Sequence, residues 1–173
     1  VANIGGFSLD APLSKLEISK RYDYFSKSLS ELNLDGVELI PQTMAPFPWH
    51  FGGQRYQNLF MHADDIVERC EKLDLRICLD VSHSKLACNH FQTDYGEFIR
   101  KVAPYVAHIH MGDAKGVNGE GLSLGDGEIN IPELCELLNK YCPDASFIPE
   151  IWQGHKNEGE GFWEALKELE KWL

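Results

Sequence analysis

Hydrophobic and polar positions alternate along the chain with two different periods. Short apolar runs have the length of buried strands, and they lie at 1–8, 36–42, 75–81, 105–111 and 146–151. Between these runs, apolar residues recur every three or four positions, as on one face of a helix, at 13–33, 57–73, 94–102, 132–141 and 160–173. Strict alternation of strands and helices predicts a parallel sheet with right-handed crossovers, and therefore an α/β fold. The chain contains no linker or low-complexity segment, so we expect one domain.

Acidic and imidazole side chains lie in or at the ends of the last four predicted strands. They are Glu38, Asp80 followed by His83, His110 and Glu150. Because parallel strands present their carboxyl ends at one face of the sheet, we expect these side chains to converge. Converging carboxylates repel one another unless a cation lies between them. Carboxylate and imidazole ligands without a thiolate suit Mn²⁺, Mg²⁺, Co²⁺ or Zn²⁺, so the pattern predicts one divalent metal site.

Each of these residues also has a purely structural interpretation. On that interpretation Glu38 is a charge at a sheet edge, and Asp80 caps a helix. His110 would then be a hydrogen-bonded core residue, and Glu150 a solvated strand end. The recurrence of such residues at four successive strands favours the metal site.

Composition and charge narrow the class of protein. Hydrophobic residues make up 43% and charged residues 25% of the 173 residues, as in a globular domain with a core. The net charge of −11 argues against binding to nucleic acid or to an anionic membrane, because both call for a basic face. No apolar run reaches the ~18–20 residues of a transmembrane helix, and the first residues lack the features of a signal peptide. The five cysteines include no CxxC pair, which indicates reduced thiols and a cytoplasmic location.

Four segments together resemble a known family. They read GVELIPQ, CLDVSH, HIHMGDAKG with the later LGDGEI, and FIPEIW. These resemble the last four strand motifs of the xylose isomerase-like TIM-barrel superfamily, which includes epimerases related to tagatose 3-epimerase and the endonuclease IV type of AP endonuclease. The resemblance implies that residues 1–173 form the C-terminal portion, about strands four to eight, of a (β/α)8 barrel. A full barrel takes about 250 residues, so we expect the chain either to form a homo-oligomer or to lack an N-terminal half-barrel.

The resemblance also implies roles for individual residues. Glu38, Asp80, His110 and Glu150 would hold one divalent ion, with Glu38 and Glu150 doubling as the catalytic acid/base pair. His83 would bind substrate oxygens.

Three further residues are expected to bind substrate. Lys115 lies near the place where the epimerases have a substrate-binding arginine. Trp49 belongs to an aromatic loop that would form an apolar wall against a sugar, or would simply pack over the barrel mouth. Asp113 would orient His110 or a substrate hydroxyl.

The implied function is that of a divalent-metal-dependent isomerase or epimerase of a small sugar or sugar-like ketone. It would act by proton transfer through an enediolate, with the carbohydrate as its small-molecule partner. One alternative is a metal-dependent phosphoesterase of the AP endonuclease type, but the loop NGEGLSLGDGEI lacks the histidine that such enzymes carry there. The other is a non-catalytic barrel domain of a larger sugar-biosynthetic enzyme.

Overall fold

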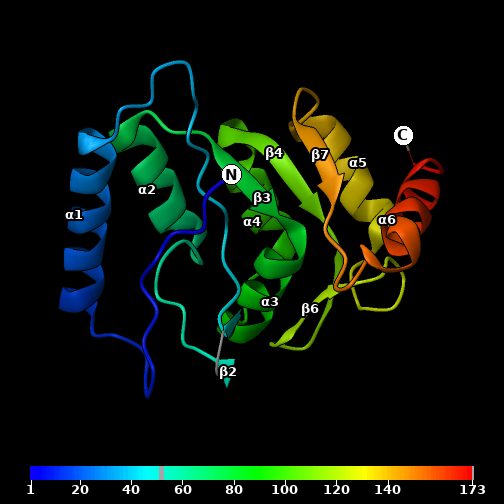
Figure 1. Ribbon diagram of the computed structural model, residues 1–173, viewed down its shortest axis with the longest axis horizontal. Coiled ribbons are helices and arrows are strands. Elements are labelled where there is room, and N and C mark those ends of the chain that lie inside the picture. The colour runs from blue at the N-terminus through cyan, green and yellow to red at the C-terminus, as the bar shows by residue number, and fades with distance from the viewer. Residues whose placement is uncertain (51–52, 173) are drawn as a thin grey trace.

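The computed structural model describes residues 1–50 and 53–172 and shows helices packed around a small parallel sheet (Figure 1). The helices are α1 (Lys15–Glu31), α2 (Ala63–Leu73), α3 (Val81–Phe91), α4 (Tyr95–Val102), α5 (Ile131–Tyr141) and α6 (Lys156–Leu169), with a 3-10 turn η1 (Ala103–Tyr105). The strands are β1 (Trp49–His50), β2 (Gly53–Gln54), β3 (Ile77–Asp80), β4 (Val106–Met111), β5 (Asp113–Lys115), β6 (Gly119–Leu122) and β7 (Ser146–Pro149). No described helix is long and apolar enough to cross a membrane.

The central sheet is parallel and has the order β3-β4-β7. Two single bridges continue it beyond β3, because Gln42 pairs in parallel with Cys78 and Ala2 pairs in parallel with Pro41. Five segments of the chain therefore lie side by side in sequence order, as consecutive strands of a (β/α) barrel do. The described segments do not close into a barrel, so the sheet leaves one face open.

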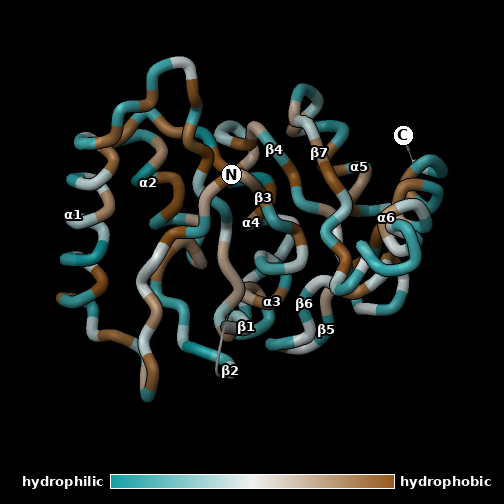
Figure 2. Tube along the Cα trace, in the orientation of Figure 1, coloured by the Kyte–Doolittle hydropathy of each residue, from teal (hydrophilic) through white to brown (hydrophobic). Residues whose placement is uncertain are grey.

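The two faces of the sheet differ in chemistry. Ile109 and Met111 of β4 point toward the helices and are buried with Leu134 and Leu138 of α5. Along β4 these residues alternate with histidines, which appears as alternating hydropathy in Figure 2. On the open face Ile148 remains 45% exposed. The helices thus bury one side of the sheet, while the other side carries the polar residues and some uncovered apolar area.

Three predicted elements differ from the structure. The expected strands at 1–8 and 36–42 make only isolated bridges, at Ala2 and Ser8 in the first and at Pro41 and Gln42 in the second. The helix expected at 57–73 begins only at Ala63, since the preceding segment is held extended by backbone bonds such as Gln57 N–H to the Pro46 carbonyl at 3.0 Å.

Helix α3 was not predicted, because it follows β3 with no intervening loop. Asp80 ends the strand and also caps the helix, and its side chain accepts a hydrogen bond from the His83 backbone N–H at 2.8 Å. Because the strand passes directly into the helix, no polar loop in the sequence separates the two elements.

Candidate metal centre

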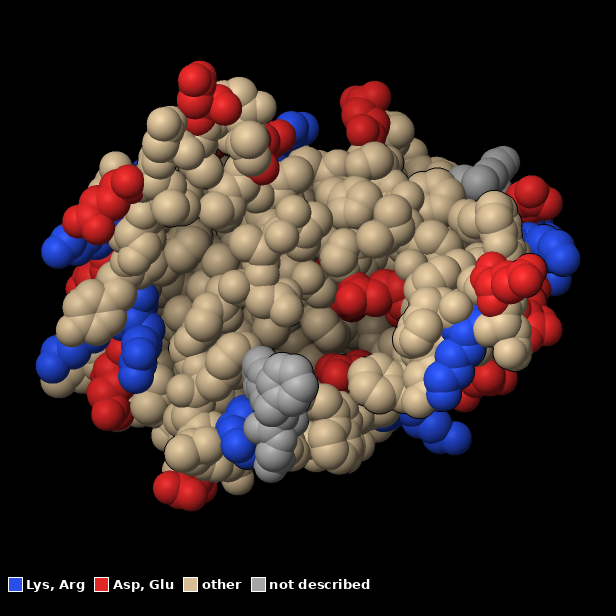
Figure 3. Space-filling view, in the orientation of Figure 1, with Lys and Arg blue, Asp and Glu red and all other residues tan. Residues whose placement is uncertain are grey.

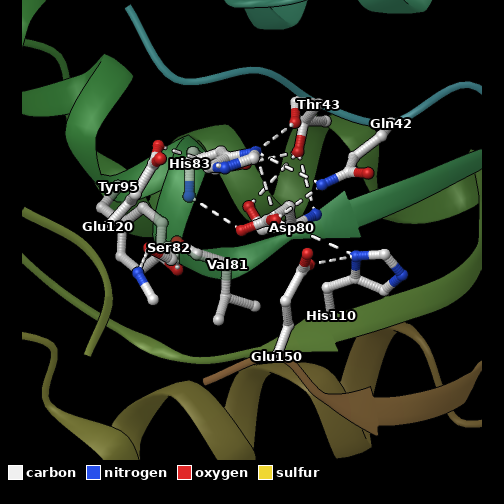
Figure 4. A network of polar contacts seen from close by, with 12 residues as sticks. Gln42, Thr43, Asp80, Val81, Ser82, His83, Tyr95, His110, Glu120 and Glu150 are labelled. Atoms are coloured by element: carbon white, nitrogen blue, oxygen red, sulfur yellow. Dashed lines mark hydrogen bonds and ion pairs between the residues drawn. The ribbon is translucent and has the colours of Figure 1, made fainter. Parts of the chain in front are cut away.

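Three of the four expected metal ligands meet at the carboxyl ends of adjacent strands (Figure 4). Asp80 ends β3, His110 lies in β4 opposite Asp80, and Glu150 follows β7. One potential ligand atom from each residue lies within 4.8 Å of the others. The Glu150 backbone N–H donates to the carbonyl of Met111 in β4 at 2.7 Å, which fixes Glu150 beside β4. The pairing register of the strands therefore brings the three candidate ligands together.

The imidazole of His110 has the surroundings of a cation ligand. Its Nδ1 contacts a carboxylate oxygen of Glu150 and lies 4.0 Å from Oδ2 of Asp80. This nitrogen is buried and makes no hydrogen bond of regular geometry. Contact with His110 also holds the pKa of Glu150 below its usual range. A buried nitrogen that faces two carboxylates without a regular hydrogen bond fits a divalent cation, which would satisfy all three groups at once.

Asp80 combines a structural and a ligand-like arrangement. One carboxylate oxygen caps α3, and the other accepts a hydrogen bond from the side-chain amide of Gln42 at 2.7 Å. Burial of the carboxyl raises its pKa to about 6. The helix-cap interpretation and the metal-ligand interpretation of this residue are therefore compatible, since different oxygens serve the two roles.

His83 lies between two carboxylates. Its Nδ1 is 3.1 Å from Asp80 Oδ2, and its Nε2 is 3.5 Å from Glu120 Oε2. Burial alone would lower the pKa of His83, but Asp80 and Glu120 together raise it to about 9. Its two ring nitrogens are therefore engaged by carboxylates at the edge of the site.

The expected placement of Glu38 at this centre is wrong. Glu38 is exposed and forms a two-bond ion pair with Arg76, with Oε1 accepting from Nε at 2.7 Å. The cause is register, because Gln42 is the residue that pairs with the strand β3 and Glu38 lies four positions earlier. The amide of Gln42 therefore contacts Asp80 where a carboxylate was expected. The sequence did not reveal this, because the register of the run 36–42 is set by its pairing with β3.

Asp113 is fully buried and holds a loop rather than facing a substrate. Its carboxylate accepts four backbone N–H bonds of 2.8–3.0 Å, from Ala114, Gly125, Gly127 and Ile129. A Cβ on Gly127 would lie 2.2 Å from Oδ1 of Asp113, so only glycine fits there. The expectation that Asp113 orients His110 is wrong, because its acceptor positions are used by the loop.

A cavity of about 510 Å³ opens over the centre. Its lining includes Asp80, His83, Glu120, Glu150, Trp152 and Lys156. Figure 3 shows acidic side chains in a hollow on this face, surrounded by uncharged residues. In the described part of the chain, neither Trp49 nor Lys115 lines this cavity, and Trp49 is 55% exposed. Glu120 lies on the short strand β6, Trp152 in the turn after β7 and Lys156 at the start of α6. The glycines and polar residues around them gave no periodic signal in the sequence.

This fold and this set of ligands place the chain in a known family. It belongs to the xylose isomerase-like TIM-barrel family, whose model matches residues 3–172. An uncharacterized protein of Methanocaldococcus jannaschii is 29% identical over 76 residues, which cover 44% of this chain and 25% of that protein.

Several solved structures share the fold. A D-tagatose 3-epimerase-like protein aligns with a TM-score of 0.62 and 20% identity, over 95% of this chain and 62% of that one. D-psicose 3-epimerase from Clostridium cellulolyticum aligns with a TM-score of 0.66 and 15% identity, over 96% and 61% of the two chains. The probable 3-DHS dehydratase of Bacillus anthracis gives a TM-score of 0.66 at 15% identity, over 97% and 61%. The chain thus spans about three fifths of these structures and has the α/β fold of TIM-barrel epimerases, with an open sheet.

Proposed function

We propose that this protein binds one divalent cation through Asp80, His110 and Glu150 and transfers a proton in a small sugar or sugar-like ketone, as an isomerase or epimerase. The observation that carries the proposal is the convergence of three ligand atoms within 4.8 Å at the mouth of a parallel sheet. The fold supports it, since D-psicose 3-epimerase and a D-tagatose 3-epimerase-like protein share that fold.

The residues around the cavity would have different roles in the reaction. A bound cation would stabilise negative charge that develops on substrate oxygens. The Glu150 side chain is 52% exposed at the mouth, so a carboxylate oxygen can reach a proton on the carbon next to the carbonyl. His83 lines the cavity beside Asp80 and Glu120, where it would face substrate oxygens, and the exposed ring of Trp152 offers an apolar face to a sugar.

A second candidate function is a non-catalytic barrel domain that binds the cation. Gln42 favours this candidate, because a neutral amide lies where a fourth ligand and catalytic carboxylate were expected. An AP endonuclease-type phosphoesterase has less support, since acidic residues dominate the cavity and Lys156 is the sole Lys or Arg in its described lining.

Calorimetric titration with Mn²⁺ and isotope exchange distinguish these functions. Purified protein is incubated in D₂O with Mn²⁺ and D-fructose, D-tagatose or L-ribulose, and deuterium at the carbon next to the carbonyl is measured by NMR. Exchange that disappears on addition of EDTA supports the isomerase or epimerase. Mn²⁺ binding without exchange favours the non-catalytic domain, and the absence of Mn²⁺ binding contradicts both.

A further inference from the structure

The described site contains one member of the expected acid/base pair. Glu150 lies at the cation centre, but Glu38 is paired with Arg76 away from it. Inversion of a carbon next to a carbonyl needs a proton-transfer group on each of its two faces. If the proposed function holds, a second group must therefore reach the cavity from another element.

Glu120 on β6 is a further carboxylate at the cavity. Its side chain is 17% exposed and lines the same cavity as Asp80 and Glu150. Figure 4 shows its carboxylate directed at His83 from the side away from Asp80. The distance of 3.5 Å between Glu120 Oε2 and His83 Nε2 places the carboxylate at the edge of the cation centre, one side chain away from Asp80.

The hairpin that carries Glu120 is fastened to both sides of the cavity. The Gly121 N–H donates to Ser82 Oγ at 2.9 Å, and the Gly121 carbonyl accepts from the Trp152 N–H at 2.6 Å. Ser82 lies in the first turn of α3, and Trp152 follows Glu150 by two residues. Gly121 has a φ of +65°, and a Cβ there would lie 3.3 Å from the Trp152 nitrogen. These contacts hold Glu120 in a fixed relation to His83 and to the segment of Glu150.

We propose that Glu120 is the second proton-transfer carboxylate of this site. Glu150 removes the proton from the carbon next to the carbonyl, and the C–H electron pair becomes the double bond of an enediol-type intermediate. Glu120, having first taken up a proton from solvent, delivers it to the opposite face of that carbon, and the carbonyl is restored. Proton exchange with solvent then returns both carboxyl groups to their starting states. One proton leaves and one arrives, so the step needs no oxidant or reductant. The assignment rests on the proposed function.

The test compares Glu120→Gln, Glu150→Gln and, as a matched control, Glu38→Gln. Each variant is titrated with Mn²⁺ by calorimetry and incubated in D₂O with both members of two C3-epimer pairs, D-fructose with D-allulose and D-tagatose with D-sorbose. We expect Glu120→Gln to bind Mn²⁺ within about twofold of the wild type, because Glu120 is outside the ligand set, and to form the epimer about 10²–10⁴-fold more slowly. Glu150→Gln should lose Mn²⁺ affinity as well, and Glu38→Gln should change nothing.

The isotope pattern separates a reacting carboxylate from one that only positions His83. From the epimer whose proton faces Glu150, Glu120→Gln should still incorporate deuterium into recovered substrate, whereas exchange from the other epimer should fall together with epimerisation. Equal loss of exchange from both epimers, or epimerisation within tenfold of the wild type, overturns the assignment of Glu120. Wild-type protein that binds Mn²⁺ but exchanges no ketose overturns the proposed function and this assignment with it.

Discussion

Gln42 donates its side-chain amide to a carboxylate oxygen of Asp80 at 2.7 Å, across 38 positions of sequence. The amide stabilises one buried carboxylate but adds no negative charge to the centre. The cation site therefore has three candidate anionic or imidazole ligands and a neutral neighbour.

Replacing this amide should strengthen cation binding. We expect Gln42→Glu to raise Mn²⁺ affinity about tenfold or more, because it adds a fourth ligand, and to lower the melting temperature of the cation-free protein, because buried carboxylates repel. Calorimetry and thermal unfolding with and without Mn²⁺ measure both effects. Gln57→Glu is the matched control, since Gln57 is equally buried but bonds to the Ile4 carbonyl. It should lose stability without gaining affinity.

The two roles of Asp80 can be separated by substitution. Asp80→Asn keeps an oxygen that caps α3 and removes the charge, so Mn²⁺ affinity should fall at least tenfold while stability changes by about 1 kcal/mol or less. Asp94→Asn provides the comparison, because Asp94 caps α4 in the same way through the Glu97 N–H. Equal Mn²⁺ binding by Asp80→Asn and wild type would remove Asp80 from the ligand set.

Cation affinity should depend on pH through Asp80. Its pKa is raised to about 6 in the cation-free protein, mainly by burial, so a proton competes with the cation below that pH. Calorimetry should show Mn²⁺ affinity falling by about tenfold per pH unit below this value. The stability effect has the opposite sign, because the folded carboxyl binds its proton more tightly than the unfolded one. The protonated Asp80 carboxyl therefore stabilises the folded cation-free protein at low pH, and this stabilisation should be lost as the pH rises through about 6.

The loop around Asp113 should depend on its buried carboxylate. Asp113→Ala leaves four backbone N–H groups without their acceptor, and we expect a loss of more than about 3 kcal/mol in the free energy of unfolding. Urea unfolding measures the change. Asp126→Ala, an exposed residue of the same loop, should stay within about 0.5 kcal/mol of the wild type. Similar losses in the two variants would show that the carboxylate does not organise the loop.

The open face of the sheet should make the isolated chain self-associate. Ile148 is 45% exposed there, and the two edge segments of the sheet have no further described partner. Covering such residues is worth about 1.5–3 kcal/mol per side chain. Light scattering should show concentration-dependent association that Ile148→Lys weakens. A monomer that stays folded on dilution contradicts this prediction.

The sequence predicted the parts of the fold and site that depend on periodicity. Asp80 ends the apolar run that forms β3, His110 lies within the run that forms β4, and Glu150 directly follows β7. Reasoning from strand ends therefore located all three. It could not distinguish Glu38 from Gln42, because the pairing register within an apolar run depends on the neighbouring strand.

Glu120 was missed, and Asp113 was given a different role from the one it has, for another reason. Both owe their positions to tertiary hydrogen bonds in a glycine-rich hairpin and loop. No periodic pattern marks contacts of that kind, and only the folded chain shows which side of the hairpin faces the cavity.

Because β3 passes directly into α3, cation binding at this centre would be thermodynamically linked to the stability of the helix. A single carboxylate both starts the helix and faces the cation centre. Whatever binds the folded centre also favours the ordered first turn of α3, by an amount set by the ligand concentration relative to its dissociation constant. That turn carries Ser82 and His83, so this wall of the cavity would be most ordered with a cation bound.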